Sequence, residues 1–370
     1  MTPLLAATLE HLRVLVGFDT RNPPRAIGTG GIFDYLKNQL AGFDVGVTDH
    51  GAGAVSLFAV RGAPKILFNV HLDTVPSSPA WSHDPLDLRV SDDRATGLGA
   101  CDIKGAAAAL IAAAAQSKGD AAFLFTTDEE ANDARCIAAF LERKLPFETV
   151  IVAEPTRCEA VLAHRGISSA VLRFKGRAGH ASGDNAAADN ALHQAVRWAN
   201  RALSFVEKQS HERFGGLTGL RFNIGRIEGG IKANVIAPTA EVRFGFRPLP
   251  SMDTDHLLKV FRDGADGTPE FTETFRGPSL PSGAIAQAET RRLAARDAAD
   301  ALGLPIGNAV DFWTEASLFS AAGYTAFVYG PGDIAQAHTA DEFVELSQLA
   351  KVTEHYVRII DQGRGHHGHA

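Results

Sequence analysis

Short apolar runs that end in polar residues recur in the first and last parts of the chain. They read KILFNV at 65–70, AAFLFTT at 121–127, TVIVA at 149–153 and TAFVYG at 325–330, and runs of this kind predict buried strands. Residues 102–119 are rich in alanine and predict a helix, because alanine has the highest helix propensity. Strands that alternate with helices predict an α/β domain with a largely parallel sheet.

The middle of the chain follows a different pattern. Residues 167–180, 219–225 and 240–247 alternate between apolar and polar side chains, as half-buried strands do. Two segments with helical spacing, roughly Ala186 to Lys208 and about 253–263, accompany these strands. The pattern predicts a small α+β unit in which a helix covers one face of a few strands.

This α+β unit interrupts the α/β domain. We expect the larger domain to comprise residues 1–167 and 280–370 and the inserted one to comprise residues 168–279. Residues 276–283, rich in Pro, Gly and Ser, mark the second junction. A chain of 370 residues is long enough for two such domains.

Composition and charge narrow the class of protein. A net charge of −7 disfavours nucleic acid as the main partner, and no apolar run is long enough to predict a membrane span. The first 20 residues predict an amphipathic helix rather than a signal peptide, because Glu10 and His11 interrupt the apolar stretch. The cysteines Cys101, Cys136 and Cys158 lack CxxC spacing and predict buried thiols in a reducing compartment. We therefore expect a cytoplasmic protein.

Polar side chains that can bind metal follow the predicted strands. They are His71, Asp73, Asp102, Glu129, Glu130, Glu154 and His338. The carboxyl ends of parallel strands meet at one edge of a sheet, where ligands bind. Histidines combined with several carboxylates suit a pair of divalent cations. Consecutive side chains point in different directions, so Glu130 can reach a metal while Glu129 remains free as a hydrolytic base.

Each of these residues also has a purely structural interpretation. The acidic residues 128–130 can form a solvated turn, and His71 can be a buried histidine with satisfied hydrogen bonds. Asp102 can cap the N-terminus of the alanine-rich helix. His338 can be a surface histidine, and Arg247 can pair with Glu241 across two strands. The number of such residues at equivalent positions favours metal binding.

Seven motifs appear in the order found in one enzyme family. They are NVHLDTVP, GLGACDIKG, TTDEE, AEPT, HRG, AGHAS and HTADE. In order and spacing the chain resembles the co-catalytic metallo-aminoacylases and carboxypeptidases (M20-like) over about residues 10–360. The segment DFWTEASLF at 311–319 is most similar to the N-acetylornithine deacetylase branch.

The resemblance implies a role for each candidate ligand. His71 and Glu154 would hold one Zn²⁺ ion, Glu130 and His338 would hold the other, and Asp102 would bridge the two. Asp73 would orient the His71 imidazole. Glu129 would take a proton from a metal-activated water and return it to the leaving amine. Co²⁺ can substitute for zinc in this scheme, and one of the two sites can be empty.

The resemblance also implies a substrate site and an oligomer. His180 would donate to the developing oxyanion, from its own subunit or across a homodimer built through the inserted lid domain. Arg247 and Asn234 would hold the substrate α-carboxylate, and Glu315 would meet a cationic substrate side chain if it is free to do so.

The expected activity is removal of an acetyl group from the α-nitrogen of a basic or ureido amino acid. The first choice of substrate is N-acetyl-L-citrulline, an intermediate of arginine biosynthesis, and the second is N-acetyl-L-ornithine. Two further hypotheses are a dipeptidase or carboxypeptidase activity and a non-catalytic relative of the fold. The three histidines of residues 363–370 can bind metal loosely, but we favour a disordered terminus as their explanation.

Overall fold

The computed structural model describes residues 1–131, 133–183 and 190–362. The chain divides into two compact units. The first comprises Met1–Leu162, Arg291–Gly307 and the residues from Thr314 onward, and the second comprises Ala163–Thr290 and Asn308–Trp313. The inserted domain predicted at residues 168–279 falls within the second unit, and its boundaries remain a prediction.

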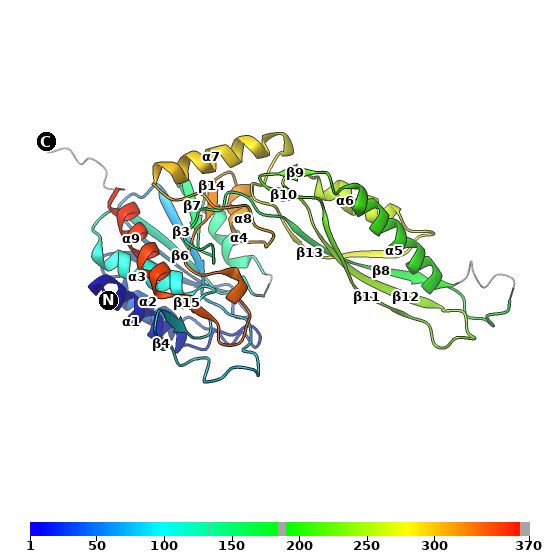
Figure 1. Cartoon of the computed structure of the whole chain (residues 1–370), viewed down its shortest axis with the longest axis horizontal. Coiled ribbons are helices and arrows are strands. Elements are labelled where there is room, and N and C mark those ends of the chain that lie inside the picture. The colour runs from blue at the N-terminus through cyan, green and yellow to red at the C-terminus, as the bar shows by residue number, and fades with distance from the viewer. Residues whose placement is uncertain (132, 184–189, 363–370) are drawn as a thin grey trace. The chain divides into compact units, whose positions relative to one another are not determined.

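A six-stranded sheet forms the centre of the first unit (Figure 1). Its strands, in spatial order, are β1 (Asp44–Asp49), β2 (Val55–Arg61), β6 (Ala121–Thr126), β3 (Ile66–His71), β7 (Thr149–Val152) and β14 (Thr325–Val328). The last four run parallel to one another, whereas β2 is antiparallel to both of its neighbours, β1 and β6. The predicted α/β domain with a largely parallel sheet is confirmed, and the antiparallel edge is an addition to it.

Helices cover both faces of this sheet. They are α1 (Pro3–Val16), α2 (Ile32–Gln39), α3 (Lys104–Gln116), α4 (Arg135–Leu141), α7 (Ala288–Ala301), α8 (Ala316–Ala321) and α9 (Leu346–Gln362). On one face, α3 packs against both α1 and α9. On the other, Phe58 of β2 contacts Phe140 of α4, which contacts Phe319 of α8.

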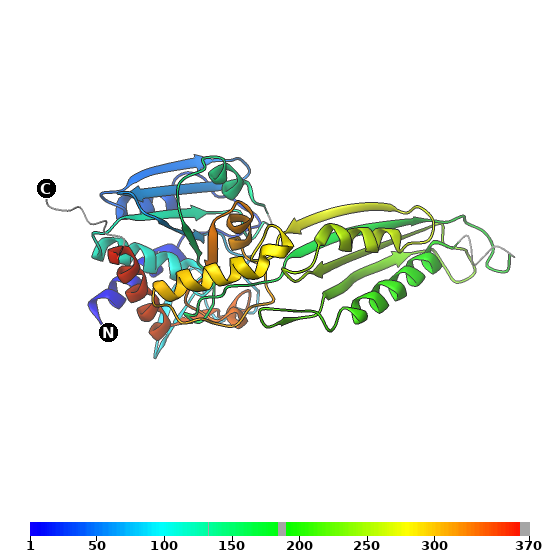
Figure 2. The same ribbon diagram turned by 90° about the horizontal axis from the view of Figure 1, so that it is seen from above.

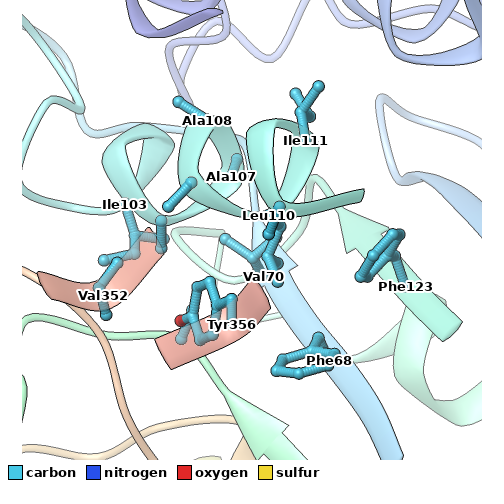
Figure 3. Close-up of a cluster of buried hydrophobic side chains, with 14 of the residues drawn as sticks. Phe68, Val70, Ile103, Ala107, Ala108, Leu110, Ile111, Phe123, Val352 and Tyr356 are labelled. Atoms are coloured by element: carbon cyan, nitrogen blue, oxygen red, sulfur yellow. The ribbon is translucent and has the colours of Figure 1, made fainter. Parts of the chain in front are cut away.

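Alanine explains how α3 can be buried on all sides. Residues 104–114 of this helix are buried, because the short alanine side chains let neighbouring elements approach closely. Figure 3 shows Leu110 of α3 beside Val70 of β3, with Val352 and Tyr356 of α9 nearby. This core supports the loop immediately before α3, which carries Asp102.

A short three-stranded sheet completes the first unit. It consists of β15 (Phe343–Glu345), β5 (Arg94–Thr96) and β4 (Arg89–Ser91), all antiparallel. Two 3₁₀ turns, Ile285–Gln287 and Ile334–Gln336, lie in connecting segments. The pairing of β15 with β5 brings the end of the HTADE segment beside residues 94–97.

The second unit is an antiparallel sheet with helices on one face (Figure 2). Its strands, in spatial order, are β11 (Arg221–Gly229), β12 (Thr239–Arg247), β8 (Ile167–Lys175) and β13 (Glu270–Gly277). The covering helices are α5 (Ala191–Lys208) and α6 (Thr254–Asp263). A small hairpin joins β9 (Arg213–Phe214) to β10 (Leu217–Thr218). The predicted α+β character of this region is confirmed.

The alternating pattern of β12 determines which face the helices cover. Val242, Phe244 and Phe246 are buried in the core beneath α5 and α6, whereas Arg243 on the opposite face is exposed. Trp198 of α5 contacts this core, and its Nε1 donates to the carbonyl of Phe261 over 2.7 Å.

The start of α5 differs from the prediction. The sequence pattern predicts a helix from about residue 186, but the helix begins at Ala191, because the Asn190 side chain accepts hydrogen bonds from the amides of Leu192 and His193 and caps the helix there. Residues 184–189 lie outside the described part of the chain. No helix among the described residues is long and apolar enough to cross a membrane.

Candidate metal centre

Three neighbouring parallel strands carry candidate ligands at their carboxyl ends. His71 is the last residue of β3, Glu130 follows β6 by four residues, and Glu154 follows β7 by two. β3 lies between β6 and β7 in the sheet, so the three side chains share one edge.

The first group of metal-binding side chains is buried. His71 Nε2 lies 3.2 Å from Asp102 Oδ1 and 3.9 Å from Glu154 Oε1. The donor atoms of these three residues all lie within 4.8 Å of one another. One imidazole and two carboxylates at this separation can enclose a divalent cation.

A second group shares Asp102 with the first. His338 Nε2 lies 3.1 Å from Glu130 Oε1 and 3.5 Å from Asp102 Oδ2, and these donor atoms also lie within 4.8 Å of one another. The two oxygens of Asp102 thus face different groups. The side chains fit a pair of divalent ions with mixed nitrogen and oxygen ligands and a shared carboxylate.

Glu342 fixes the loop that carries Asp102. The backbone amides of Gly99, Cys101 and Asp102 all donate to the Glu342 carboxylate. The N-cap residue of α3 is Ile103, and no side chain makes a capping hydrogen bond there. The interpretation of Asp102 as a helix cap is therefore wrong, since its carboxylate is directed toward the two histidines.

The support of His71 also differs in detail from the expectation. The Nδ1 atom of His71 lies 2.9 Å from the backbone oxygen of Asp73 and 3.5 Å from its carboxylate. The Asp73 carboxylate instead accepts from the Asn22 side chain, over 3.0 Å, and from the Glu130 amide, over 3.1 Å. Asp73 thus contacts a candidate ligand in each group.

The acidic triplet does not form a solvated turn. Asp128 is buried, and its carboxylate accepts from the Cys136 amide over 2.8 Å. Glu129 and Glu130 are half-buried. Burial raises the pKa of Glu129 to about 8; His71 opposes the rise, whereas Glu130, Asp102 and Asp73 add to it.

The same crowding of charge affects the histidines. Burial lowers the pKa of His71, but hydrogen bonds to Asp102 and Asp73 outweigh burial, so the pKa lies well above its usual value. The hydrogen bond to Glu130 raises the pKa of His338 to about 9, although partial burial opposes it. The surrounding carboxylates therefore favour the protonated form of both imidazoles.

Glu315 lies inside the first unit near the same carboxylates. It is buried, and its Oε2 lies 3.4 Å from the Thr126 hydroxyl. Its Oε1 has no hydrogen-bond partner among the described residues. Burial, with Asp128 and Glu129 adding to its effect, raises the pKa of Glu315 well above the usual value.

The other candidate substrate-binding residues belong to the second unit. His180 and Asn234 are both exposed. They lie close together in the fold, since the amide of Ala181, the residue after His180, donates to the Asn234 carbonyl over 3.1 Å. Arg247 lies at the far end of β12, and a strand of nine residues separates its ends by about 26 Å. Within one chain, Asn234 and Arg247 are therefore not brought together.

Arg247 is a half-buried cation facing open space. Its Nη1 is buried without a hydrogen-bond partner among the described residues, and its side chain lines a hollow of about 300 Å³ together with Ser168 and Asn223. Burial lowers the pKa of Arg247, nearby Asp311 opposes the change, and Arg165 adds to it. A guanidinium in this setting is suited to a carboxylate ligand. The expected pairing with Glu241 is absent from the described structure, since Glu241 pairs with Arg173 and Arg243.

Sequence reasoning missed Glu342, Asn22 and Arg165. Arg165 of the HRG motif is buried and donates to Asp311 and to the carbonyls of Thr218 and Gly219. Glu342 was visible as the last residue of HTADE, four positions after His338, but its role depends on contacts across the fold. The histidines of residues 363–370 lie outside the described residues.

The sheet edge with its two overlapping groups of ligands defines a metallohydrolase centre. Residues 67–362 match the model of Peptidase family M20/M25/M40, and the chain belongs to this family. The chain is 72% identical to the N-acetyl-L-citrulline deacetylase of Xanthomonas campestris pv. campestris, an alignment that covers 98% of this chain and 99% of that protein. It is also 31% identical to an acetylornithine deacetylase of Myxococcus xanthus, over 94% of both chains.

A solved structure has the same fold. The M20 family metallo-carboxypeptidase Sso-CP2 from Sulfolobus solfataricus superposes with a TM-score of 0.72, over 98% of this chain and 99% of that one. The sequence identity is 17%, so this likeness concerns the fold alone.

Proposed function

We propose that this chain hydrolyses the acetamide of N-acetyl-L-citrulline to citrulline and acetate, a step of arginine biosynthesis. The observation that carries the proposal is the 72% identity, over nearly the whole chain, to a protein with this activity in its name. The complete set of candidate ligands supports a catalytic protein over a non-catalytic relative of the fold. N-acetyl-L-ornithine is the second candidate substrate, because the relative at 31% identity is an acetylornithine deacetylase.

We assign the ligands by the two groups of donor atoms. His71 and Glu154 would hold one ion, Glu130 and His338 would hold the other, and Asp102, which belongs to both groups, would be shared between them. We propose Zn²⁺ as the native metal, with Co²⁺ able to replace it. When bound, the ions polarise the amide carbonyl and lower the pKa of water.

Glu129 serves as the general base in this proposal. It belongs to neither group of donor atoms among the described residues, yet it lies close enough to His71, Glu130 and Asp102 to interact with them electrostatically. Its carboxylate can take a proton from the attacking water and deliver it to the leaving amine. Nearby cations favour the ionised form that a base requires.

A homodimer follows if His180, Asn234 and Arg247 all act on one substrate. Arg247 is the last residue of β12, whereas Asn234 precedes the first residue of this strand, so a single chain cannot present both to one α-carboxylate. We infer that Arg247 comes from one subunit, and that His180 and Asn234 come from the lid of its partner. In this arrangement His180 donates to the oxyanion.

Glu315 bears on the choice between the two substrates. Acetylornithine has a cationic side chain, whereas acetylcitrulline has a neutral ureido group. Burial raises the pKa of the Glu315 carboxyl well above its usual value and so favours its neutral form. A neutral carboxyl offers a hydrogen-bond donor and an acceptor rather than a negative charge. This property favours the ureido substrate.

The test is to compare kcat/KM for N-acetyl-L-citrulline and N-acetyl-L-ornithine with the zinc-loaded protein. We expect the first value to be at least about tenfold higher, as the loss of a buried polar pairing implies. A tenfold preference for acetylornithine would overturn the first choice. Hydrolysis of unacetylated dipeptides at a comparable rate would point to a peptidase instead.

The three free, buried cysteines support a reducing compartment, which we infer to be the cytoplasm.

A further inference from the structure

Glu342 is a buried carboxylate that contacts three backbone amides of one loop. Its Oε1 accepts from the amides of Cys101 and Asp102, both over 2.8 Å. Its Oε2 accepts from the Gly99 amide over 3.1 Å. The side chain is 1% exposed, so protein groups rather than solvent satisfy it.

These bonds connect the segments that carry two of the candidate ligands. Glu342 lies four residues after His338 and directly before β15, whose Phe343 pairs with Thr96 of β5. The Glu342 carbonyl also accepts from the Gly97 amide over 3.0 Å. Residues 342–345 therefore run beside residues 94–97, and the Glu342 carboxylate joins them to the loop of residues 99–102.

The loop requires an acceptor of this kind. Gly99 has a φ of +78°, a conformation that suits glycine. A Cβ at Gly332 would lie 2.5 Å from Cys101 Sγ, so the other side of the loop is closely packed. Three amides that converge in such a place form a nest of donors, which the two oxygens of one carboxyl group can satisfy together.

We propose that Glu342 is a positioning residue that fixes the backbone at Asp102, so that the two Asp102 oxygens face the two histidines. Those oxygens lie 3.2 Å from His71 Nε2 and 3.5 Å from His338 Nε2, and a small rotation of the loop would separate one of them from its group. Glu342 also follows His338 closely in the chain. Its hydrogen bonds therefore fix the position of the two groups of candidate ligands relative to each other. The inference rests on the proposed role of these side chains as metal ligands and does not depend on which acetylated amino acid is the substrate.

The experiment compares zinc binding by the metal-free wild-type chain, Glu342→Gln and Glu345→Gln. In Glu342→Gln the amide oxygen can still accept from Cys101 and Asp102, but the amide NH₂ group opposes the Gly99 N–H. Glu345 is the matched control: it lies three residues further on, in β15, and accepts from Gln348 over 3.2 Å. Competition with a chromophoric chelator gives the affinity of each site, thermal unfolding of the metal-free proteins gives their stability, and kinetics of the loaded proteins give kcat and KM.

For Glu342→Gln we expect zinc affinity to fall about 10–100-fold, as is usual when a residue that supports a metal ligand is replaced. We also expect kcat to fall while KM changes little, because Glu342 makes no contact with substrate in this proposal. Glu345→Gln should match the wild type in both respects. If Glu342→Gln is not recovered folded, Glu342→Asp replaces it, with the same expectation, since the shorter side chain keeps the carboxyl group but cannot reach all three amides.

Wild-type zinc affinity at both sites in Glu342→Gln overturns the inference, even if its metal-free form unfolds at a lower temperature. An equal loss of affinity in Glu345→Gln overturns it as well, because the effect would then be unspecific. A wild-type chain that binds two zinc ions but hydrolyses neither acetylated amino acid contradicts the proposed function alone. The zinc comparison still tests Glu342 in that case.

Discussion

Glu129 and Glu130 are adjacent in the chain, yet they differ in what they contact. Glu130 Oε1 lies 3.1 Å from His338 Nε2 and belongs to the second group of donor atoms, to which Glu129 does not contribute. The difference arises because the two residues form a turn after β6, where consecutive side chains diverge. One acidic residue can therefore bind a cation while the next exchanges protons beside it.

The Glu129→Gln variant tests this division of roles. We expect it to bind the same number of zinc ions as the wild type, because no metal ligand is lost. Turnover of N-acetyl-L-citrulline should fall at least about 100-fold, since the amide cannot accept the proton and general bases contribute about 10²–10⁴-fold. Metal content by elemental analysis and kcat measure the two effects. A variant that keeps most of the kcat would remove Glu129 from its proposed role.

At the scale of single residues, the sequence singled out the five side chains that form the two groups of donor atoms, but it missed how they are held. His71 and Glu154 could be found because each stands at or just after an apolar run that ends in polar residues. Glu342 and Asn22 could not, because their contacts join segments far apart in the chain: Asn22 reaches Asp73 across 51 residues, and Glu342 reaches Asp102 across 240.

At the scale of elements, α3 illustrates how composition determines position. Its alanines let it pack closely between α1, α9 and the sheet. If one of its few larger side chains is shortened, the neighbouring elements cannot move in to fill the space. Leu110 is one of these and is fully buried. Because α3 directly follows the Asp102 loop, its packing also supports the metal centre.

Leu110→Ala should lower the free energy of unfolding by about 2–5 kcal/mol, the usual cost of removing a buried leucine and leaving a cavity. Urea unfolding followed by circular dichroism measures the change. Leu293→Ala is the control, because this leucine of α7 is 44% exposed and its truncation should cost less than about 0.5 kcal/mol. Equal losses in the two variants would contradict the buried position of α3.

Helix α9 contains a titrating group that should affect stability. Burial lowers the pKa of His355 to about 4, and Arg358 and Lys351 lower it further. The Tyr329 hydroxyl contacts His355 Nδ1, which must be unprotonated to accept a hydrogen bond. A histidine in the unfolded chain titrates near 6.5. As pH falls from 6.5 toward 4, the unfolded state therefore binds the proton first, and the folded state loses stability.

His355→Gln should weaken this dependence on pH. The glutamine does not titrate, so the fall in stability between pH 6.5 and 4.5 should be smaller than in the wild type. The difference should be on the order of 1 kcal/mol, because His355 is only half-buried and solvent screens its charge. Urea unfolding of the two metal-free proteins at both pH values measures it. Parallel curves would show that His355 keeps its ordinary pKa.

Two of the strands that the sequence did not predict are short or exposed. β4 has three residues, all exposed, and β1 has no fully buried position, so neither shows an apolar run. By contrast, β3 and β6 are buried almost throughout and were predicted within one or two residues. Among these four strands, the local pattern identifies the two that are covered on both faces, and it misses the two that lie at the edge of a sheet.

At the scale of the whole chain, the change of period from buried runs to alternating strands revealed the second unit. The set of chain segments that form this unit was not fully predictable. Residues 308–313 return to it from the C-terminal part of the chain, where Asp311 pairs with the buried Arg165. An ion pair between residues 146 positions apart leaves no local signal, so the sequence predicted a simple insertion.

The charge of the metal centre links metal binding to the stability of the first unit. Asp73, Asp102, Glu129, Glu130 and Glu154 converge on one edge of the sheet, and each buried carboxylate costs free energy unless a cation or a proton compensates it. The ligands come from segments spread between His71 and His338, so unfolding disperses them. Zinc should therefore bind the folded chain much more tightly than the unfolded one.

Removal of zinc with a chelator should lower the temperature of thermal unfolding by several degrees, and added Zn²⁺ should restore it. A ligand at 100 times its Kd stabilises the folded state by about 2.7 kcal/mol per site, and two sites roughly double this gain.

His338→Ala is the matched variant: it removes a donor from the second group only, so zinc should recover about half of the stabilisation. Calorimetry of each protein with and without zinc measures these shifts. A full zinc response in His338→Ala would mean that His338 holds no ion, and the absence of any response in the wild type would contradict both sites.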